Sequence, residues 1–316
     1  MRSAYRGCVL SFALGVGLFL VGCGGPGGAG RPEPYSDPYF TRVMTSGHAA
    51  FERGDIARAA ELYQRARVRA ERADRDDWLL ASAYNAALAH HLLGDSARAR
   101  EGLSTAQTAA LALDDPAVDV RLLFAELEWN DQRVDAAWAL LEGLMDASLT
   151  RPHRVQVHSL RALIALDTGD VEQARQEIAA AEHQLRRSTA WRLRARVAEV
   201  NGRIAWREEA SAQAAAHFDD EAYYYQQDGR FEDRARAQLR AAEAHLAADD
   251  PMTAVDRYLR AARHFAAGDE QVLALQSARS ALTGLERVED EAWRSAQIER
   301  VLQLKEKLKQ VPVPDV

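Results

Sequence analysis

The sequence predicts an all-α fold in which six or seven helical hairpins stack as a solenoid. Of the 316 residues, 47% are hydrophobic, 28% are charged and only 7% are aromatic, a composition typical of closely packed helices. An alanine recurs every 37 to 40 residues, and a large apolar residue follows it four positions later. Glycine–aspartate pairs separate the two halves of three repeats, as expected at turns between helices.

The chain begins with a predicted secretory signal peptide, residues 1–22. Basic Arg2 and Arg6 precede an apolar stretch that runs from Gly7 to Gly22. This stretch is shorter than the ~20 apolar residues that a membrane-spanning helix needs, and four glycines interrupt it. An uncleaved anchor is the alternative interpretation.

Leu20-Val21-Gly22-Cys23, at the end of this segment, resembles the lipobox of bacterial lipoproteins. The resemblance implies that Cys23 is lipidated and becomes the first residue of the mature chain. Gly24 rather than aspartate follows Cys23, which implies sorting to the outer membrane, facing the periplasm. The other cysteine, Cys8, would be removed with the signal, so no thiol would remain for a disulfide or a metal site.

Residues 23–38 form the predicted lipidated N-terminus and a flexible tether, because they are rich in glycine and proline and lack apolar periodicity. Residues 39–310 form the predicted helical repeat domain. The tail VPVPDV, residues 311–316, is predicted to be disordered because its prolines prevent a helix.

The repeat is defined by four positions, of which the alanine and the residues four and seven positions later lie on one helical face. The recurring alanines are Ala59, Ala99, Ala136, Ala174, Ala214 and Ala254. Four residues later come Tyr63, Leu103, Leu140, Ile178, Phe218 and Tyr258. Seven residues later come Ala66, Ala106, Gly143, Ala181, Glu221 and Ala261, of which Glu221 departs from the pattern. Twelve residues earlier come Gly47, Ala87, Phe124, Ala162, Gly202 and Ala242.

Turns are predicted inside each repeat, where a residue that accepts the left-handed conformation precedes an aspartate that can cap the next helix. Asp115-Pro116 and Asp250-Pro251 also predict helix starts, with proline at the first helical position. The fifth repeat breaks the pattern with Glu208-Glu209. The predicted turn pairs are Gly54-Asp55, Gly94-Asp95, Asn130-Asp131, Gly169-Asp170 and Asp249-Asp250.

Residues 270–310 predict a degenerate seventh hairpin that caps the solenoid with a polar outer face. Its apolar stripe consists of Trp293, Ile298, Val301, Leu304 and Leu308.

The segment GHAAFERGDIARAAELYQRA, residues 47–66, resembles the tetratricopeptide repeat (TPR), and a less regular match extends from residue 40 to about 265. These repeats are longer than the ~34 residues of the family. The resemblance implies a right-handed solenoid that binds a peptide or protein in a groove lined by the first helix of each hairpin. Its implied groove residues are Met44, His48, Phe51, Tyr84, Leu88, His91, Arg121, Glu128, Arg203 and Trp206.

No catalytic motif emerges from the sequence, so we expect neither an enzyme nor a cofactor. The formal net charge of −7 argues against a nucleic-acid partner. His90 and His91 are adjacent, which is the wrong spacing for a zinc pair on a helix. Of Tyr223-Tyr224-Tyr225, two rings are expected to pack and one to reach solvent.

These patterns predict a membrane-anchored lipoprotein that acts as a protein–protein interaction scaffold or assembly factor in the bacterial cell envelope. The partner would be an envelope protein or peptide that the sequence does not identify. The alternative is an envelope protein that uses the same groove to bind a cell-wall glycan or peptide, or to act on it as an enzyme.

Overall fold

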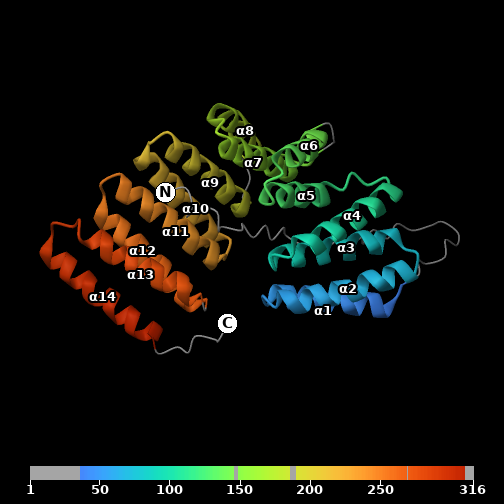
Figure 1. Cartoon of the computed structure of the whole chain (residues 1–316), viewed down its shortest axis with the longest axis horizontal. Coiled ribbons are helices and arrows are strands. Elements are labelled where there is room, and N and C mark those ends of the chain that lie inside the picture. The colour runs from blue at the N-terminus through green and yellow to red at the C-terminus, as the bar shows by residue number, and fades with distance from the viewer. Residues whose placement is uncertain (1–35, 146–148, 186–189, 269, 310–316) are drawn as a thin grey trace, which may run out of the picture. The chain divides into compact units, whose positions relative to one another are not determined.

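A computed structural model describes residues 36–145, 149–185, 190–268 and 270–309. These ranges contain fourteen α-helices and no strand, which confirms the predicted all-α solenoid (Figure 1). Successive helices pair as seven hairpins. The helices are α1 Pro38–Glu52, α2 Ile56–Arg72, α3 Asp76–Leu92, α4 Ser96–Ala112, α5 Val118–Asn130, α6 Val134–Met145, α7 Arg151–Thr168, α8 Val171–Leu185, α9 Trp191–Arg207, α10 Ser211–Gln227, α11 Phe231–Ala247, α12 Pro251–Ala267, α13 Gln271–Leu285 and α14 Glu291–Lys309.

The chain divides into two compact units, the first with α1 to α6 and the second with α7 to α14. Within each unit, a helix packs chiefly against its neighbours in the sequence, as in other helical repeat proteins. The core of each unit therefore follows the seams between successive helices and is made largely of alanine and leucine.

The repeat positions predicted from the sequence are buried in five of the six aligned hairpins. Ala59, Ala99, Ala174, Ala214 and Ala254 are all fully buried. Gly47 and Gly202 face the rings of Tyr63 and Phe218 so closely that an added Cβ would lie 2.7 Å and 2.5 Å from the respective ring. A small residue twelve positions before the alanine is therefore a packing requirement in these two hairpins.

The register predicted for the third hairpin is wrong by one residue. Ala136 is exposed, whereas Ala137 is fully buried. The buried residues that follow are Leu141 and Leu144 instead of Leu140 and Gly143, and Ala125 replaces Phe124 in the first helix. Since one residue rotates a side chain by about 100° around a helix, the shift exchanges a core position for a surface one. Aspartate at Ala137, and not at Ala136, is therefore expected to destabilise the fold.

The turn geometry explains this shift. A residue with positive φ stands five positions before the buried alanine in every aligned hairpin, once Ala137 replaces Ala136. In the third hairpin this residue is Gln132, one position after the predicted pair Asn130-Asp131. The six residues are Gly54, Gly94, Gln132, Gly169, Glu209 and Asp249.

Aspartate caps the second helix in four of these turns, as predicted. Asp55 accepts from the backbone N–H of Arg58 at 3.2 Å, and Asp95 accepts from that of Arg98 at 3.0 Å. Asp170 and Asp250 make the same contact. The fifth turn has Glu209 at φ 60° followed by Ala210, which has no side chain to cap α10.

The two predicted proline starts differ. Pro251 begins α12, with Asp250 as its cap. Pro116 does not begin a helix, because α5 starts at Val118 after Ala117, which has φ 48°. The Asp115 carboxylate instead accepts from the N–H of Ala117 at 2.7 Å, which closes a turn before the helix.

The helical domain begins slightly earlier than residue 39. Pro38 is the first residue of α1, and the Asp37 carboxylate accepts from the N–H groups of Tyr39 and Phe40 at 2.8 and 3.1 Å. Asp37 is 2% exposed and also pairs with Arg69 of α2 at 2.5 Å. The last two residues assigned to the tether therefore belong to the fold. The signal peptide, Cys23 and residues 311–316 lie outside the described residues.

The seventh hairpin, α13 and α14, closes unit 2. Val301 is fully buried, and Trp293 and Leu304 pack beside it, as the predicted stripe requires. Ile298 is instead 36% exposed, so that stripe is narrower than expected. The side chain of Leu308 lies outside the described residues.

Candidate partner-binding site

The first helices of the hairpins carry the ten side chains that the TPR resemblance assigns to a groove. Six of these side chains keep solvent-accessible surface and four are buried. Leu88, which is 1% exposed, belongs to the core and not to a surface. The accessible six are His48, Phe51, Tyr84, Arg121, Arg203 and Trp206. The buried four are Met44, Leu88, His91 and Glu128.

Three of these side chains in unit 1 hold a buried polar atom with no hydrogen-bond partner in the described part of the chain: His48 Nε2, Tyr84 Oη and His91 Nε2. Burial lowers the pKa of His48 more than the nearby Glu52 raises it, and burial also lowers the pKa of His91. The pKa of Tyr84 is raised, chiefly by burial. All three groups are therefore neutral near pH 7, and each keeps one buried polar atom without a hydrogen bond to the described residues.

On α5 the register shift removes both predicted groove residues from the expected face. Arg121 donates to the backbone oxygen of Leu140 at 3.5 Å, and Glu128 binds Arg100 at 3.1 Å and also Arg133. When the repeat is counted from Ala137, the residues of α5 at the groove positions of the other hairpins are Leu122 and Trp129. Trp129, which is half-buried, is the side chain that the sequence alignment missed, and only the turn at Gln132 could have revealed it.

In unit 2 the predicted groove residue Arg203 is part of a buried ion network across α9, α10 and α11. Arg203 donates to Glu199 at 2.6 Å, and Arg196 donates to the same carboxylate at 3.3 Å. Arg240 of α11 donates to Glu221 of α10 through Nε at 3.2 Å and through Nη2. Both carboxylates are 0% exposed, so the departure of Glu221 from the repeat pattern is compensated by an arginine on the next helix.

The two carboxylates of this network have opposite pKa shifts. Burial raises the pKa of Glu221 to about 7; the Arg240 charge opposes this shift, and the neighbouring Glu199 charge adds to it. Burial also opposes ionisation of Glu199, but the charges of Arg203, Arg196 and Arg240 outweigh it and lower its pKa to about 2. Glu199 is therefore the permanent anion of the network, whereas Glu221 exchanges a proton near neutral pH.

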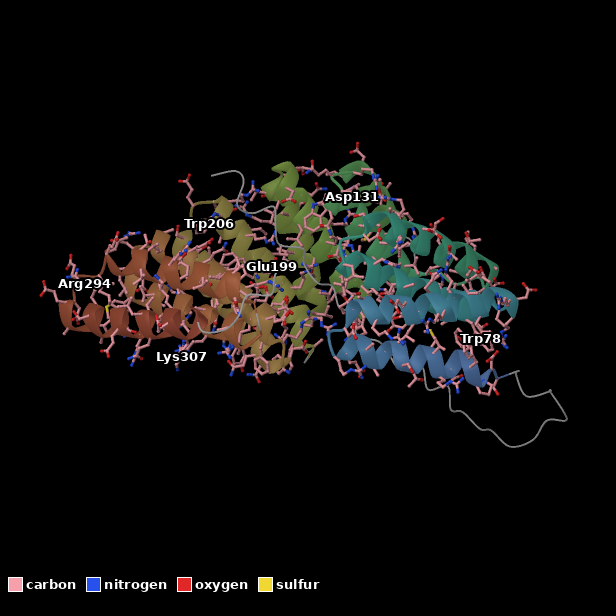
Figure 2. The ribbon with its side chains drawn as sticks, turned by 60° about the horizontal axis from the view of Figure 1, so that its bottom comes forward. Trp78, Asp131, Glu199, Trp206, Arg294 and Lys307 are labelled. Carbon is pink, nitrogen blue, oxygen red and sulfur yellow. The ribbon has the colours of Figure 1, made fainter. Side chains whose placement is uncertain are left out.

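The network reaches solvent at Arg203, whose side chain is 25% exposed. Trp206 lies three residues further along α9 (Figure 2). It is half-buried against the core cluster that includes Ala205 and Ala214. An arginine oriented by a buried carboxylate, next to an indole ring on the same helical face, is a combination common in protein interfaces.

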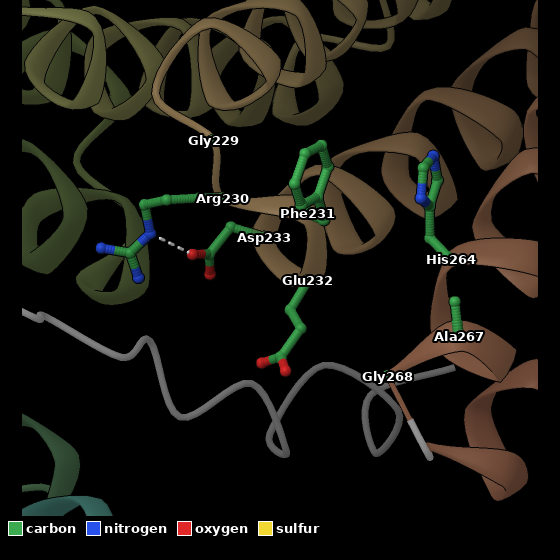
Figure 3. A pocket seen from close by; sticks show the side chains of 8 residues that line it. All are labelled: Gly229, Arg230, Phe231, Glu232, Asp233, His264, Ala267 and Gly268. Carbon is green, nitrogen blue, oxygen red and sulfur yellow. Dashed lines mark hydrogen bonds and ion pairs between the residues drawn. The ribbon is translucent and has the colours of Figure 1, made fainter. Parts of the chain in front are cut away.

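An open depression of about 500 Å³ lies where α11 begins and α12 ends (Figure 3). Phe231 is 58% exposed and stacks on His264, with ring centroids 6.3 Å apart. Arg230 is held by Asp233 on the opposite side of the depression. No side chain in this group was predicted as a site residue. The lining residues are Gly229, Arg230, Phe231, Glu232, Asp233, His264, Ala267 and Gly268.

The described ranges contain no group of three or more His, Cys, Asp or Glu side chains that could hold a metal ion. None of the fourteen described helices has the length and apolar character that a membrane span requires. The Tyr223-Tyr224-Tyr225 run behaves as predicted, since Tyr223 is 52% exposed, Tyr224 is half-buried and Tyr225 is buried.

The paired helices, the small residue packed against a ring and the repeated turn define a TPR-like helical repeat protein. The apo form of RapI has a TM-score of 0.58 with this chain at 10% identity, over 86% of this chain and 99% of RapI. A Rap protein complexed with the competence and sporulation factor has a TM-score of 0.53 at 12% identity, over 86% of this chain and 77% of that one.

A third similar structure is the APC/C hetero-tetramer Cut9–Hcn1, with a TM-score of 0.57 at 12% identity over 83% of this chain. The match covers 43% of the Cut9–Hcn1 chain, so this protein spans less than half of that length. At such identities the likeness establishes the fold alone. No family model and no curated protein matches the sequence.

Proposed function

We propose that this protein is a lipid-anchored scaffold that binds partner proteins in the bacterial cell envelope. The observation that carries the binding part is the TPR-like fold with unpartnered polar atoms on its first helices, His48 Nε2 and Tyr84 Oη among them. Natural proteins rarely leave buried polar atoms without a partner in the described structure, and a bound peptide would supply the missing hydrogen bonds. Two similar structures, Cut9–Hcn1 and the Rap complex, are themselves complexes with another molecule.

The anchoring part of the proposal rests on the sequence from Leu20 to Cys23. Lipidation of Cys23 would add two or more acyl chains, and stable anchoring needs more than one. The Gly- and Pro-rich segment after Cys23 would then connect the membrane to Asp37, where the fold begins. The glycine after Cys23 supports an outer-membrane location with the repeats in the periplasm.

The anchor is tested by Cys23→Ser in the full-length chain expressed in a Gram-negative bacterium. The unsubstituted chain is expected in the membrane fraction with the mass of a cleaved, acylated protein. The variant is expected to lose acylation and cleavage at residue 23. If mass and fractionation of the variant equal those of the original chain, the lipid anchor is wrong and the uncleaved anchor is the better interpretation.

The scaffold is tested by crosslinking in intact cells, with Tyr84→Phe as the diagnostic variant. Removing an unpartnered hydroxyl leaves the packing almost unchanged, so the thermal stability should be retained. Recovery of the crosslinked partner should fall if the hydroxyl binds it. Tyr39→Phe, which changes an exposed residue of α1, serves as the control.

Failure of the unsubstituted chain to crosslink any envelope protein would contradict the scaffold. A thermal-shift screen with purified cell-wall fragments would then examine the ligand-binding alternative, because a ligand that binds only the folded state raises the melting temperature.

A further inference from the structure

Two successive hairpins of unit 2 repeat the same arrangement of side chains outside the core. Trp191 at the start of α9 stacks on Tyr224 of α10, with ring centroids 6.1 Å apart and an interplanar angle of 18°. Phe231 at the start of α11 stacks on His264 of α12 at 6.3 Å and 13°. Each residue of the second pair lies 40 positions after its counterpart in the first, which is the repeat length here.

An arginine accompanies each pair, three residues after the first ring and thus on the same helical face. Arg194 lies 6.0 Å from the centroid of the Tyr224 ring. Arg234, its counterpart, is close enough to His264 to lower the pKa of that imidazole, an effect second only to burial. We call these six residues the aromatic–arginine ridge: Trp191, Arg194, Tyr224, Phe231, Arg234 and His264.

The solenoid does not need this ridge for its packing. In the next hairpin the positions that correspond to Phe231 and Arg234 are Gln271 and Ala274, and α13 forms without an aromatic pair there. Phe231 is 58% exposed, which is unusual for a phenylalanine that serves only the core. The open depression beside Phe231 gives the ring a neighbouring space that a ligand can enter (Figure 3).

Around the ridge residues of α11 and α12, which are Phe231, Arg234 and His264, positive charge exceeds negative charge. Asp219 and Asp256 are shared by Arg257 and Arg260 of α12. Among the described residues, neither Arg234 nor Arg263 lies within ion-pair distance of a carboxylate; Arg263 donates instead to the backbone oxygen of Leu259 at 3.2 Å.

The pKa of the Arg234 guanidinium is lowered by burial and then by the charges of Arg260 and Arg257. The pKa of His264 is lowered by burial and then by Arg234, Arg263 and Arg260. In both groups burial makes the largest contribution to the pKa shift, and the charge contributions that add to it come from neighbouring arginines. These arginines create a local positive field in a protein whose net charge is −7. The lining of the depression contains two acidic side chains, Glu232 and Asp233, and Asp233 is paired with Arg230.

We propose that the aromatic–arginine ridge binds an acidic segment of a partner protein. Carboxylates of that segment would pair with Arg234 of the ridge and with Arg263, which precedes His264 on α12. An apolar side chain would enter the depression against Phe231. Charge complementarity selects an acidic occupant, and exposed aromatic and arginine side chains are the types that contribute most to protein interfaces. This inference rests on the proposed scaffold function. It specifies the surface of unit 2 on which the partner docks and the acidic character of the docking segment.

The test is fluorescence anisotropy with the full-length chain in neutral detergent. The probe is a labelled peptide of glutamate and alanine with one central phenylalanine, and a peptide with lysine in place of glutamate is the negative probe. The original chain should bind only the glutamate peptide. Arg234→Gln with Arg263→Gln should weaken that binding about tenfold at low salt, and added salt should reduce the difference. Phe231→Ala should also weaken it about tenfold.

The matched control is Arg65→Gln with Arg72→Gln on α2, which removes the same charge from two exposed arginines in unit 1. This control should change the Kd by no more than about twofold, because these two charges take no part in the proposed contact. Equal Kd values for the control and the Arg234/Arg263 variant would overturn the proposal. Stronger binding to phosphatidylglycerol vesicles than to the peptide would also overturn it, in favour of a membrane contact.

The same variants separate this inference from the proposed function. If the original chain crosslinks envelope proteins and the Arg234/Arg263 variant recovers the same set in equal yield, the scaffold stands and the ridge is not its docking surface. If the original chain recovers none, the scaffold itself is wrong. If the Arg234/Arg263 variant loses specific partners while the control variant keeps them, and the melting temperature is unchanged, the result supports both the scaffold function and the ridge as its docking surface.

Discussion

Hairpins α1–α2 and α9–α10 share their defining contact but differ one helical turn further along. In the first, the Tyr63 ring packs on Gly47; in the second, the Phe218 ring packs on Gly202. Three residues after the ring, the first hairpin buries Ala66 and the second buries Glu221. The same backbone position thus accepts a methyl group or a carboxylate.

What differs is the residue on the following helix. Glu221 meets Arg240, which lies 19 positions later, whereas the residue 19 positions after Ala66 is Asn85. A buried carboxylate is tolerated only when a charge partner and hydrogen bonds replace its lost hydration. The comparison shows that the repeat constrains the location of a buried side chain, while its neighbours decide its chemistry.

The largest expected effect comes from breaking the buried pair. Glu221→Ala should lower the free energy of unfolding by about 3 kcal/mol, because Arg240 loses its main bidentate partner inside the unit. Chemical denaturation with circular dichroism provides the measurement. Glu221→Ala combined with Arg240→Met should cost less than Glu221→Ala alone; an equal or greater cost would contradict the pairing.

The reciprocal test transfers the charge into the first hairpin. Ala66→Glu should destabilise by about 3 kcal/mol, since Asn85 cannot neutralise a buried carboxylate. Adding Asn85→Arg should recover part of the loss if the position of the arginine is what matters. No recovery in a thermal denaturation series would mean that the two hairpins differ in more than this pair.

Stability should also depend on pH through unit 2. The pKa of Glu221 is raised to about 7 in the folded chain, so the folded state binds its proton more tightly than the unfolded state does. The stabilisation from this group is complete at a pH well below the unfolded value of 4.5 and is lost as the pH rises through 7, by about 3 kcal/mol in all.

Glu199 acts in the opposite sense, because its pKa is lowered to about 2. Its contribution is present above the unfolded value of 4.5 and is lost as the pH falls towards 2. Urea unfolding of the original chain and of Glu221→Gln, measured between pH 4.5 and 7.5, isolates the contribution of Glu221 to the pH dependence of the free energy of unfolding. Parallel pH profiles for the two proteins would show that Glu221 does not titrate in this range.

Overpacking the shared contact should affect both hairpins alike. Gly47→Ala and Gly202→Ala each place a Cβ within 3 Å of a ring, which should cost about 1–3 kcal/mol. Gly47→Ala with Tyr63→Leu should relieve the clash in the first hairpin. A neutral effect of Gly202→Ala would mean that Phe218 can move aside without cost, and melting temperatures would show this directly.

The smallest expected effect concerns the turn caps. Asp55→Ala removes the cap of α2 and should cost about 1 kcal/mol, whereas Ala210→Asp supplies the missing cap of α10 and should gain about 0.5 kcal/mol. Differential scanning calorimetry of both variants makes the comparison. A loss of stability from Ala210→Asp would indicate that the Glu209 turn cannot accept the capping geometry.

The sequence predicted the structure correctly wherever the turn residues and the periodicity of the buried alanines indicated the same register. Gly54-Asp55, Gly94-Asp95 and Gly169-Asp170 located three turns because glycine and aspartate each have a specific backbone role there. At Gln132 neither residue type is present, and the alignment chose Ala136 instead of its buried neighbour Ala137. That single residue displaced Arg121 and Glu128 from the expected face and concealed Trp129.

By itself, the sequence determined the all-helical class, the hairpin repeat and most of its buried positions, because these follow from side-chain periodicity and turn chemistry along the chain. Only the tertiary structure decided that Glu199 and Glu221 are buried together, that Arg234 meets no carboxylate among the described residues, and that Trp191 and Phe231 stack on rings of the next helix. The two stacked pairs join residues 33 positions apart, and Glu199 and Glu221 are 22 positions apart, in each case on different helices. Their chemistry depends on burial and on neighbouring charges, which no spacing rule contains.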